Sequence, residues 1–350
     1  MRVHTLETSY ELSGMEYSHI DKEIKKSKFA SKYCTYNLKK KLFSGLSKNG
    51  ITICIYGIEI PNAVTYAGGY GLRFALLYEI NPTRIFDHGN YVGLFDVDRL
   101  PDIIEVVNSL LKSVSDSLPK LEHCKLHRFD FCTNIEMPDH QLVADAIKLI
   151  NRSVCNRGYY QHMKHNYGRL EYPTLEATFT RKRDMEVSIY DKKEQLKSEN
   201  LPHNNCSDIL RCEVRCFRDY IKSLCKKYGL ANRSVTEFFA KAAEIGEYVF
   251  RHNLAKLSLD GDFYRLSAIK KIVEESNKQS EIKRRMVYIA EEAATRRDIK
   301  TVLRDMDRGE VKWLEHHFKD LHMSPMPIPV HSALSDGINL LKLCLSDDRK

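Results

Sequence analysis

The sequence predicts an α+β fold, in which a mixed or antiparallel sheet with helices on one side is followed by a helical C-terminal domain. Three observations predict it. Segments with strand character recur up to residue 217, helical periods separate some of them, and only helical periods remain after about residue 218. With 350 residues, 43% of them hydrophobic, the chain is long enough for two compact domains.

The predicted strands contain β-branched and aromatic residues and are bounded by turn residues. They are residues 51–58, 72–80, 124–133, 174–180, 185–190 and 209–217. The predicted helices show apolar residues at helical spacing, and one begins at a proline, which suits the first turn of a helix. They are residues 100–114, a helix that begins at Pro138, and residues 234–254, 262–276, 281–294, 296–306 and 308–320.

These elements predict three parts of the chain. We expect an α+β domain over residues 1–217 with its core at about 50–217, a helical region over 218–323, and a linker and tail over 324–350. Six basic residues gather within the helical region, namely Lys283, Arg284, Arg285, Arg296, Arg297 and Arg304. A helix-turn-helix-like DNA contact and an ordinary solvated helix face explain them equally well.

Charge and cysteine content restrict the setting of the protein. The net charge of +8 suits a nucleic-acid partner, although many basic proteins have none. The ten cysteines include no Cys-x-x-Cys pair, so we expect reduced thiols in a cytoplasmic protein. No signal peptide and no apolar stretch of about 20 residues is visible, so no membrane contact is expected.

Polar and charged side chains follow one face of three predicted strands. Because side chains alternate along a strand, three sets of residues each share a face. The sets are Arg128 with Asp130, Glu186 with Ser188 and Tyr190, and Arg211 with Glu213 and Arg215. If these strands are neighbours, a carboxylate pair, a tyrosine and several guanidinium groups come together.

These residue types suit a metal-assisted tyrosine nuclease that acts on DNA. Tyr190 is the candidate nucleophile, because a phenolate bound to phosphate can be displaced again. Asp130 and Glu213 are the candidate ligands of Mg²⁺ or Mn²⁺, which would polarise the phosphate. Basic side chains would offset charge on the phosphate oxygens. The candidates are Arg128, Lys192, Lys193, Arg211 and Arg215.

Other interpretations of the same residues stay open. The chain has 19 tyrosines, and a tyrosine at the end of a strand is commonly a packing residue. Asp130 could form a structural ion pair with Arg128 or Arg211, and Glu213 invites the same interpretation. Three tyrosines in a basic stretch are rival nucleophiles or base-stacking residues, namely Tyr159, Tyr160 and Tyr167.

Three motifs in this order resemble those of rolling-circle replication initiators. They are HRFDFCTN at 127–134, VSIYDKKEQL at 187–196 and ILRCEV at 209–214. The chain looks like a phage or plasmid replication protein of the gene II/X type and is similar in these motifs to the trans-acting plasmid initiators. The resemblance runs from about residue 81 to residue 329. It implies that Tyr190 nicks the origin, that a 5′-phosphotyrosine and a free 3′-OH form, and that the strand is later rejoined.

The resemblance is incomplete at the expected metal site. Plasmid initiators often have a second aspartate where this chain has Asn134, so that a ligand or base is missing or comes from elsewhere, for example from Glu186. No His-hydrophobe-His motif is present either. The commoner two-histidine metal site is therefore absent, and carboxylates should hold Mg²⁺ or Mn²⁺.

The resemblance also implies partners and leaves two alternatives. Origin DNA, single- and double-stranded, is the expected substrate, and the expected location is the cytoplasm of a bacterial host cell. A host helicase and polymerase are expected partners, and a homodimer is considered. The first alternative is a DNA-binding replication regulator of the same fold that does no chemistry. The second is a relaxase or transposase of related chemistry, which would differ in the site that it nicks.

Overall fold

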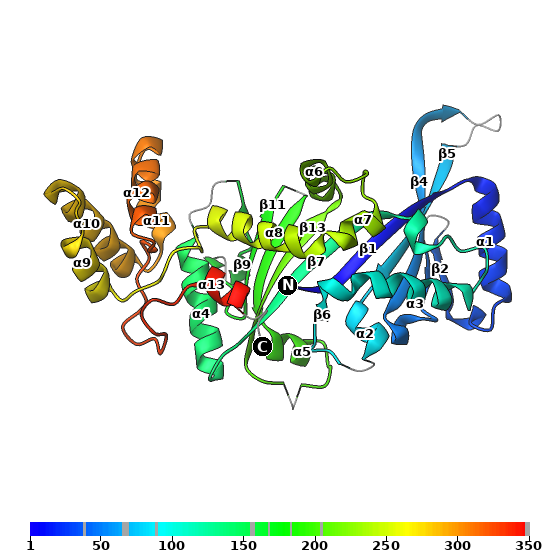
Figure 1. The fold of residues 1–350 in the computed structure, drawn as a ribbon, viewed down its shortest axis with the longest axis horizontal. Coiled ribbons are helices and arrows are strands. Elements are labelled where there is room, and N and C mark those ends of the chain that lie inside the picture. The colour runs from blue at the N-terminus through cyan, green and yellow to red at the C-terminus, as the bar shows by residue number, and fades with distance from the viewer. Residues whose placement is uncertain are drawn as a thin grey trace. The chain divides into compact units, whose positions relative to one another are not determined.

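The computed structural model describes residues 1–37, 40–64, 70–87, 90–154, 158–166, 169–182, 184–203 and 206–346. Tyr167 and Cys155 lie outside the described residues. The fold is α+β, with antiparallel β-structure and many helices, as predicted (Figure 1). The nine described cysteines are free thiols. Among the described residues, no helix combines the length and the apolar character that crossing a membrane requires.

The described chain forms two compact units, and each is built from two stretches of sequence. Unit 1 comprises Met1–Cys132 and Arg215–Ile245, and unit 2 comprises Thr133–Val214 and Gly246–Lys350. Strands β7 (Lys125–Glu136) and β13 (Ile209–Phe217) have residues in both units.

Unit 1 contains the strand order β2-β3-β4-β5-β1-β7, and β6 pairs with β1. The bounds are β1 (Arg2–Leu12), β2 (Tyr33–Asn37), β3 (Lys40–Phe43), β4 (Ile51–Val64), β5 (Tyr70–Ile80) and β6 (Phe95–Asp96). These strands pair antiparallel, with Ile51 opposite Ile80 and Leu6 opposite Phe129. β1 therefore lies between β5 and β7, although the sequence analysis assigned no strand there.

The helices of unit 1 cover an aromatic core. They are α1 (Gly14–Lys26), α2 (Pro82–Phe86), α3 (Leu100–Lys112), α6 (Arg218–Tyr228) and α7 (Val235–Ala240). Phe129 and Phe131 of β7 are fully buried, and the ring of Phe129 lies 5.2 Å from that of Phe238 in α7. Because side chains alternate along a strand, this packing on one face of β7 directs Asp130 to the other face.

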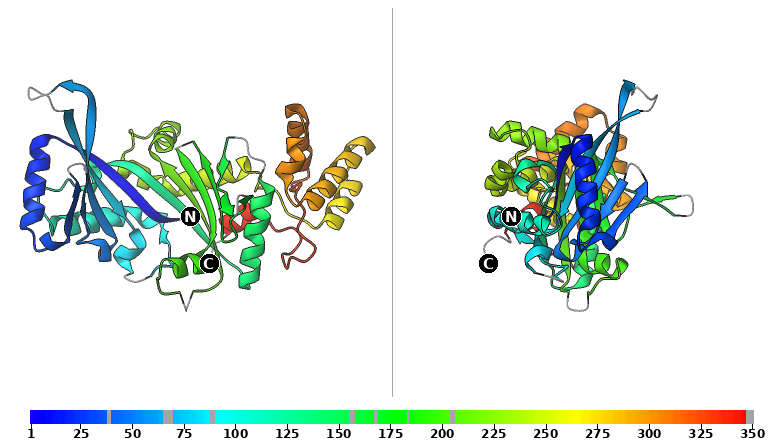
Figure 2. Two further views of the ribbon diagram at one scale, coloured as in Figure 1. Left: turned by 180° about the vertical axis from the view of Figure 1, so that it is seen from behind. Right: turned by 90° about the vertical axis from the view of Figure 1, so that its right-hand side faces the viewer.

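Unit 2 contains the strand order β13-β12-β11-β8 and a separate hairpin of β9 and β10. The bounds are β8 (Tyr160–Gln161), β9 (Lys164–Asn166), β10 (Arg169–Glu171), β11 (Glu176–Arg181) and β12 (Met185–Asp191). The remaining helices are α4 (His140–Ser153), α5 (Lys192–Ser198), α8 (Ala242–Lys256), α9 (Leu266–Glu275), α10 (Ser280–Arg296), α11 (Ile299–Arg304), α12 (Arg308–Asp320) and α13 (Leu340–Ser346). In the left view of Figure 2, α9 to α12 form one group of helices, coloured yellow to orange.

A carboxylate joins α1 to strands β2 and β3 in unit 1. Asp21 accepts hydrogen bonds from the Tyr33 hydroxyl at 2.6 Å, from Lys41 Nζ at 2.6 Å and from Lys25 Nζ at 2.8 Å. Burial acts against the charge of Asp21, but these three bonds outweigh it and lower the pKa of Asp21 to about 2. The charged form of Asp21 therefore stabilises unit 1.

We predict that Asp21→Asn lowers the free energy of unfolding by about 1 kcal/mol at pH 7, a figure reduced for the partial exposure of the site. Because the pKa in the folded state is below the ordinary value, the stabilisation is complete above about pH 5 and is lost as the pH falls toward 2. Urea denaturation from pH 7 to pH 3 should show the difference between the two proteins narrowing. Asp116→Asn, at a highly exposed position, is the control and should change little at any pH.

Candidate catalytic site

The position of Tyr190 follows from the local structure of β12. β12 pairs antiparallel with β11, where Glu176 lies opposite Tyr190 and the Thr178 hydroxyl lies 3.1 Å from the Ser188 hydroxyl. The strand ends one residue after Tyr190, because the Asp191 side chain accepts from the Glu194 backbone N–H at 3.0 Å and caps α5. Tyr190 is thus held between a paired strand and a capped helix.

A hydrogen bond joins the candidate nucleophile to a candidate ligand. The Tyr190 hydroxyl donates to Glu213 Oε1 at 2.6 Å. Glu213 is fully buried, and Tyr190 is 7% exposed. Strand alternation placed both residues on polar strand faces, and the hydrogen bond confirms that these two face each other.

Asp130 lies in the expected ion pair with Arg128. Arg128 donates from Nε and Nη2 to the two Asp130 oxygens at 2.8 and 2.6 Å, and from Nη1 to Glu7 Oε1 at 3.1 Å. Burial would lower the pKa of Arg128, but the charges of Asp130 and Glu7 outweigh burial and raise it. The guanidinium thus stays charged and compensates the fully buried Asp130 carboxylate.

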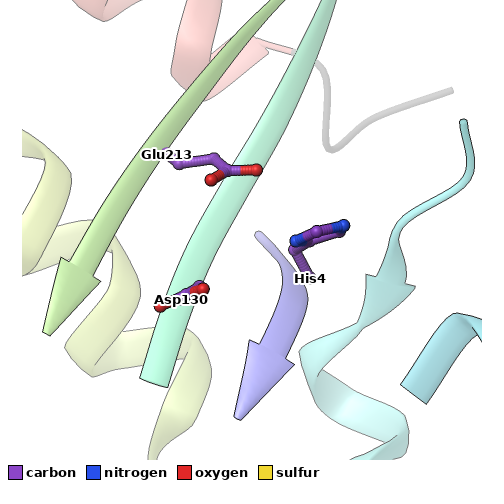
Figure 3. A group of neighbouring side chains, drawn as sticks. All are labelled: His4, Asp130 and Glu213. Carbon is purple, nitrogen blue, oxygen red and sulfur yellow. The ribbon is translucent and has the colours of Figure 1, made fainter. Parts of the chain in front are cut away.

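A histidine that the sequence analysis did not consider joins the two carboxylates. His4, Asp130 and Glu213 each offer one ligand atom, and these atoms lie within 4.8 Å of one another (Figure 3). His4 lies in an irregular part of β1, where the register with β7 shifts between Val3 and Leu6. Such a bulge redirects a side chain. The Thr5 hydroxyl lies 3.2 Å from His4 Nδ1 and helps to orient the ring.

The donor set of this group suits a divalent cation. Two carboxylates and one imidazole match ions such as Mn²⁺, and Mg²⁺ favours the oxygens alone. The three ligand atoms lie within 4.8 Å of one another, close enough for these residues to be candidates for holding one ion. The prediction of a site made from carboxylates alone is therefore extended by His4.

Asn134 and Glu186 do not belong to this group of three. Asn134 instead accepts a hydrogen bond through Oδ1 from Nε of the fully buried Arg211 at 2.8 Å. The place that an aspartate was expected to fill at position 134 is thus taken by an amide bound to an arginine. Among the described residues, His4 supplies the third ligand atom.

The basic residues expected at the phosphate lie in different environments. Lys192 is almost fully buried and donates from Nζ to Gln195 at 2.7 Å, whereas Lys193 pairs with Asp208 at 3.2 Å. Arg215 is half-buried on β13. That these side chains bind phosphate stays a prediction.

The two rival tyrosines that the structure describes, Tyr159 and Tyr160, lie in environments different from that of Tyr190. The Tyr159 hydroxyl donates to Asn253 Oδ1 at 3.0 Å, and burial raises the pKa of Tyr159 to about 12. Tyr160 lies on β8 and is 73% exposed. Tyr190 is the tyrosine whose hydroxyl is shown bonded to a residue of the proposed metal group.

The comparison with solved structures finds a distant structural likeness. No family model and no curated protein matches the chain. Among solved structures, the chain is similar to the rolling circle replication initiator protein from Geobacillus stearothermophilus, with 10% sequence identity and a TM-score of 0.30 over 64% of this chain and 77% of that one.

Proposed function

We propose that this chain nicks and rejoins one DNA strand at a rolling-circle origin, with Tyr190 as the nucleophile. The observation that carries the proposal is the 2.6 Å hydrogen bond from the Tyr190 hydroxyl to the fully buried Glu213. A carboxylate at this distance can take the phenolic proton as the oxygen attacks. The three ordered motifs around Asp130, Tyr190 and Glu213 support the same chemistry.

In the proposed reaction, Tyr190 Oη forms a bond to phosphorus while the phenolic proton passes to Glu213. The bond from phosphorus to the 3′ oxygen breaks, and this oxygen becomes a free 3′-OH by taking up the proton that Glu213 accepted. The 5′-phosphate stays on Tyr190, so the number of phosphodiester bonds is conserved and rejoining reverses the same steps. Arg128 and Arg215 carry positive charge that would offset charge on the phosphate oxygens.

Asp130, Glu213 and His4 would hold a Mn²⁺ or Mg²⁺ ion, which when bound polarises the scissile phosphate. Glu213 Oε1 accepts a hydrogen bond from the Tyr190 hydroxyl, so the same carboxylate would serve both the nucleophile and the ion. Arg128 donates to both oxygens of Asp130, but each carboxylate oxygen has a second lone pair, so Asp130 could act as a ligand while this ion pair is kept. The hydrogen bond with Thr5 would keep His4 oriented.

We predict that Tyr190→Phe lowers nicking by at least about 1,000-fold, because the covalent step loses its nucleophile. The assay uses Mn²⁺ and a supercoiled plasmid that carries the cognate origin, and a denaturing gel detects the covalent protein–DNA adduct. Tyr160→Phe, at an exposed tyrosine of unit 2, is the matched control and should form the adduct normally. Adduct formation by Tyr190→Phe at the wild-type level would show that another residue is the nucleophile.

We predict a separate effect for Glu213→Gln. The glutamine keeps an oxygen that can accept from Tyr190 but cannot take its proton, so nicking should fall about 100- to 10,000-fold. Binding of the origin duplex, measured by fluorescence anisotropy in EDTA, should stay within about 2-fold of wild type. Unchanged nicking by Glu213→Gln would exclude Glu213 as the base.

We predict that His4→Ala weakens Mn²⁺ binding about 10- to 100-fold, because one of three ligands is removed. Isothermal titration of Mn²⁺ measures this effect without any reaction. His19→Ala, at an exposed histidine of the same unit, serves as the control. Equal Mn²⁺ affinities for the His4→Ala and His19→Ala variants would contradict the prediction, because they would show that His4 does not bind the ion.

One observation favours the non-catalytic alternative. Arg128 neutralises Asp130 through both oxygens, and Tyr190 is only 7% exposed, as in a purely structural network. A DNA-binding regulator of this kind would bind the origin duplex and form no adduct even as the wild-type protein. Recruitment of a helicase and polymerase, and a homodimer, stay predictions.

A further inference from the structure

The exposed face of α12 carries a stripe of basic side chains. Arg308, Lys312, His316 and Lys319 are all exposed. At about 100° per residue, they fall within about 80° of the helix circumference and extend over about 17 Å of its length. The opposite face, with Val311, Leu314 and Phe318, is buried, so the orientation of the helix is settled by packing.

The acidic residues of α12 compensate little of this charge. Glu310 pairs with Arg285 of α10, and Asp320 pairs with Lys278 at 3.3 Å as well as with His316 at 3.4 Å. Glu315 is half-buried at the edge of the stripe. In the described chain, no ion pair joins Glu315 to Lys312 or Lys319. The stripe therefore presents net positive charge to solvent.

The basic residues that the sequence singled out on α10 differ from those of α12. Arg284 pairs with Glu281 of the same helix, and Arg296 pairs with Glu292 at 2.9 Å and with Asp305 at 2.7 Å. The guanidinium of Arg285, besides its pair with Glu310, lies 4.6 Å from the centre of the Trp313 ring. These interactions use the charges of α10 within the helical group.

We propose that α12 binds double-stranded DNA through this stripe of Arg308, Lys312, His316 and Lys319. The inference rests on the proposed function only in taking DNA as the partner of the chain. A single helix fits the major groove, and cations spaced along it can reach phosphates on the groove edges. The chain order also suits this role, because three residues, Asp305–Asp307, join α11 to α12 as in a helix-turn-helix.

The chemistry of the stripe favours duplex DNA over two other anionic partners. Single strands are bound by stacking bases on aromatic side chains, and the stripe contains three aliphatic cations and one histidine but no exposed tyrosine, phenylalanine or tryptophan. An interfacial membrane helix inserts an apolar face into lipid, whereas the apolar face of α12 is buried in protein. Binding of duplex phosphates by exposed cations remains the best match.

The test compares two triple variants with equal loss of charge. Arg308→Ala/Lys312→Ala/Lys319→Ala removes the stripe, and Arg251→Ala/Lys271→Ala/Arg284→Ala removes three exposed cations that each pair with an acid on their own helix. Both are made in full-length Tyr190→Phe protein. Fluorescence anisotropy measures binding to a mixed-sequence 30-bp duplex and to one of its strands, in EDTA at several salt concentrations, and circular dichroism checks the fold.

We expect the stripe variant to bind the duplex at least about 10-fold more weakly than its parent. The slope of log affinity against log salt should become shallower by about 2 to 3, or about 0.9 for each phosphate that the variant no longer neutralises. The control should change less than about 2-fold. Equal losses of affinity in both variants, an unchanged slope, or a weakening confined to the single strand would overturn the inference. No step of this test needs nicking. The inference about α12 can therefore be supported even if the nuclease proposal is wrong, and it can be overturned even if that proposal is right.

Discussion

The hydrogen bond between Tyr190 and Glu213 is the interaction on which the candidate site depends. Glu213 is fully buried, and a buried carboxylate is costly unless a donor or a cation compensates it. The Tyr190 hydroxyl supplies a donor at 2.6 Å, so the bond that would prepare the nucleophile also helps Glu213 to remain charged inside the protein. The same hydrogen bond therefore has a structural role and a proposed catalytic role. A substitution separates the two roles if it keeps a hydrogen-bond acceptor at position 213 but removes the base.

Strand alternation alone placed Tyr190 and Glu213 on polar strand faces, and whether the two strands are neighbours was left open. β13 has the predicted bounds, and β12 extends one residue beyond the predicted strand. With a period of two, the polar residues of each strand share a face whatever the rest of the fold does. The pair of Arg128 and Asp130 follows from the same rule, because residues two apart share a face of the strand. The aromatic residues on either side of Asp130 are packed on the opposite face.

His4 could not be predicted in the same way. The sequence analysis assigned no strand to the first 12 residues, and no local pattern indicates that this segment lies beside β7, more than 100 residues later in the sequence. The register shift between Val3 and Leu6 then changes which side chains of β1 point to the site. Pairing across a long sequence separation and a bulge both depend on tertiary structure. Asn134, which stands where the motif has an aspartate, indicated that one metal ligand was missing. It did not indicate which residue would replace that ligand.

The basic residues of α10 do not mark a binding surface, because several of them form ion pairs with acids of the same helix. Glu281 precedes Arg284 by three residues and Glu292 precedes Arg296 by four, spacings at which helical side chains meet, and both pairs form. Arg308 of α12 has no acid at such a spacing within its own helix, and Glu315, which is suitably spaced from both lysines, is half-buried and pairs with neither. Counting cations in a segment therefore overstates the charge that α10 offers to a binding partner. The quantity that matters for a phosphate is the charge left after the helix has paired its own residues.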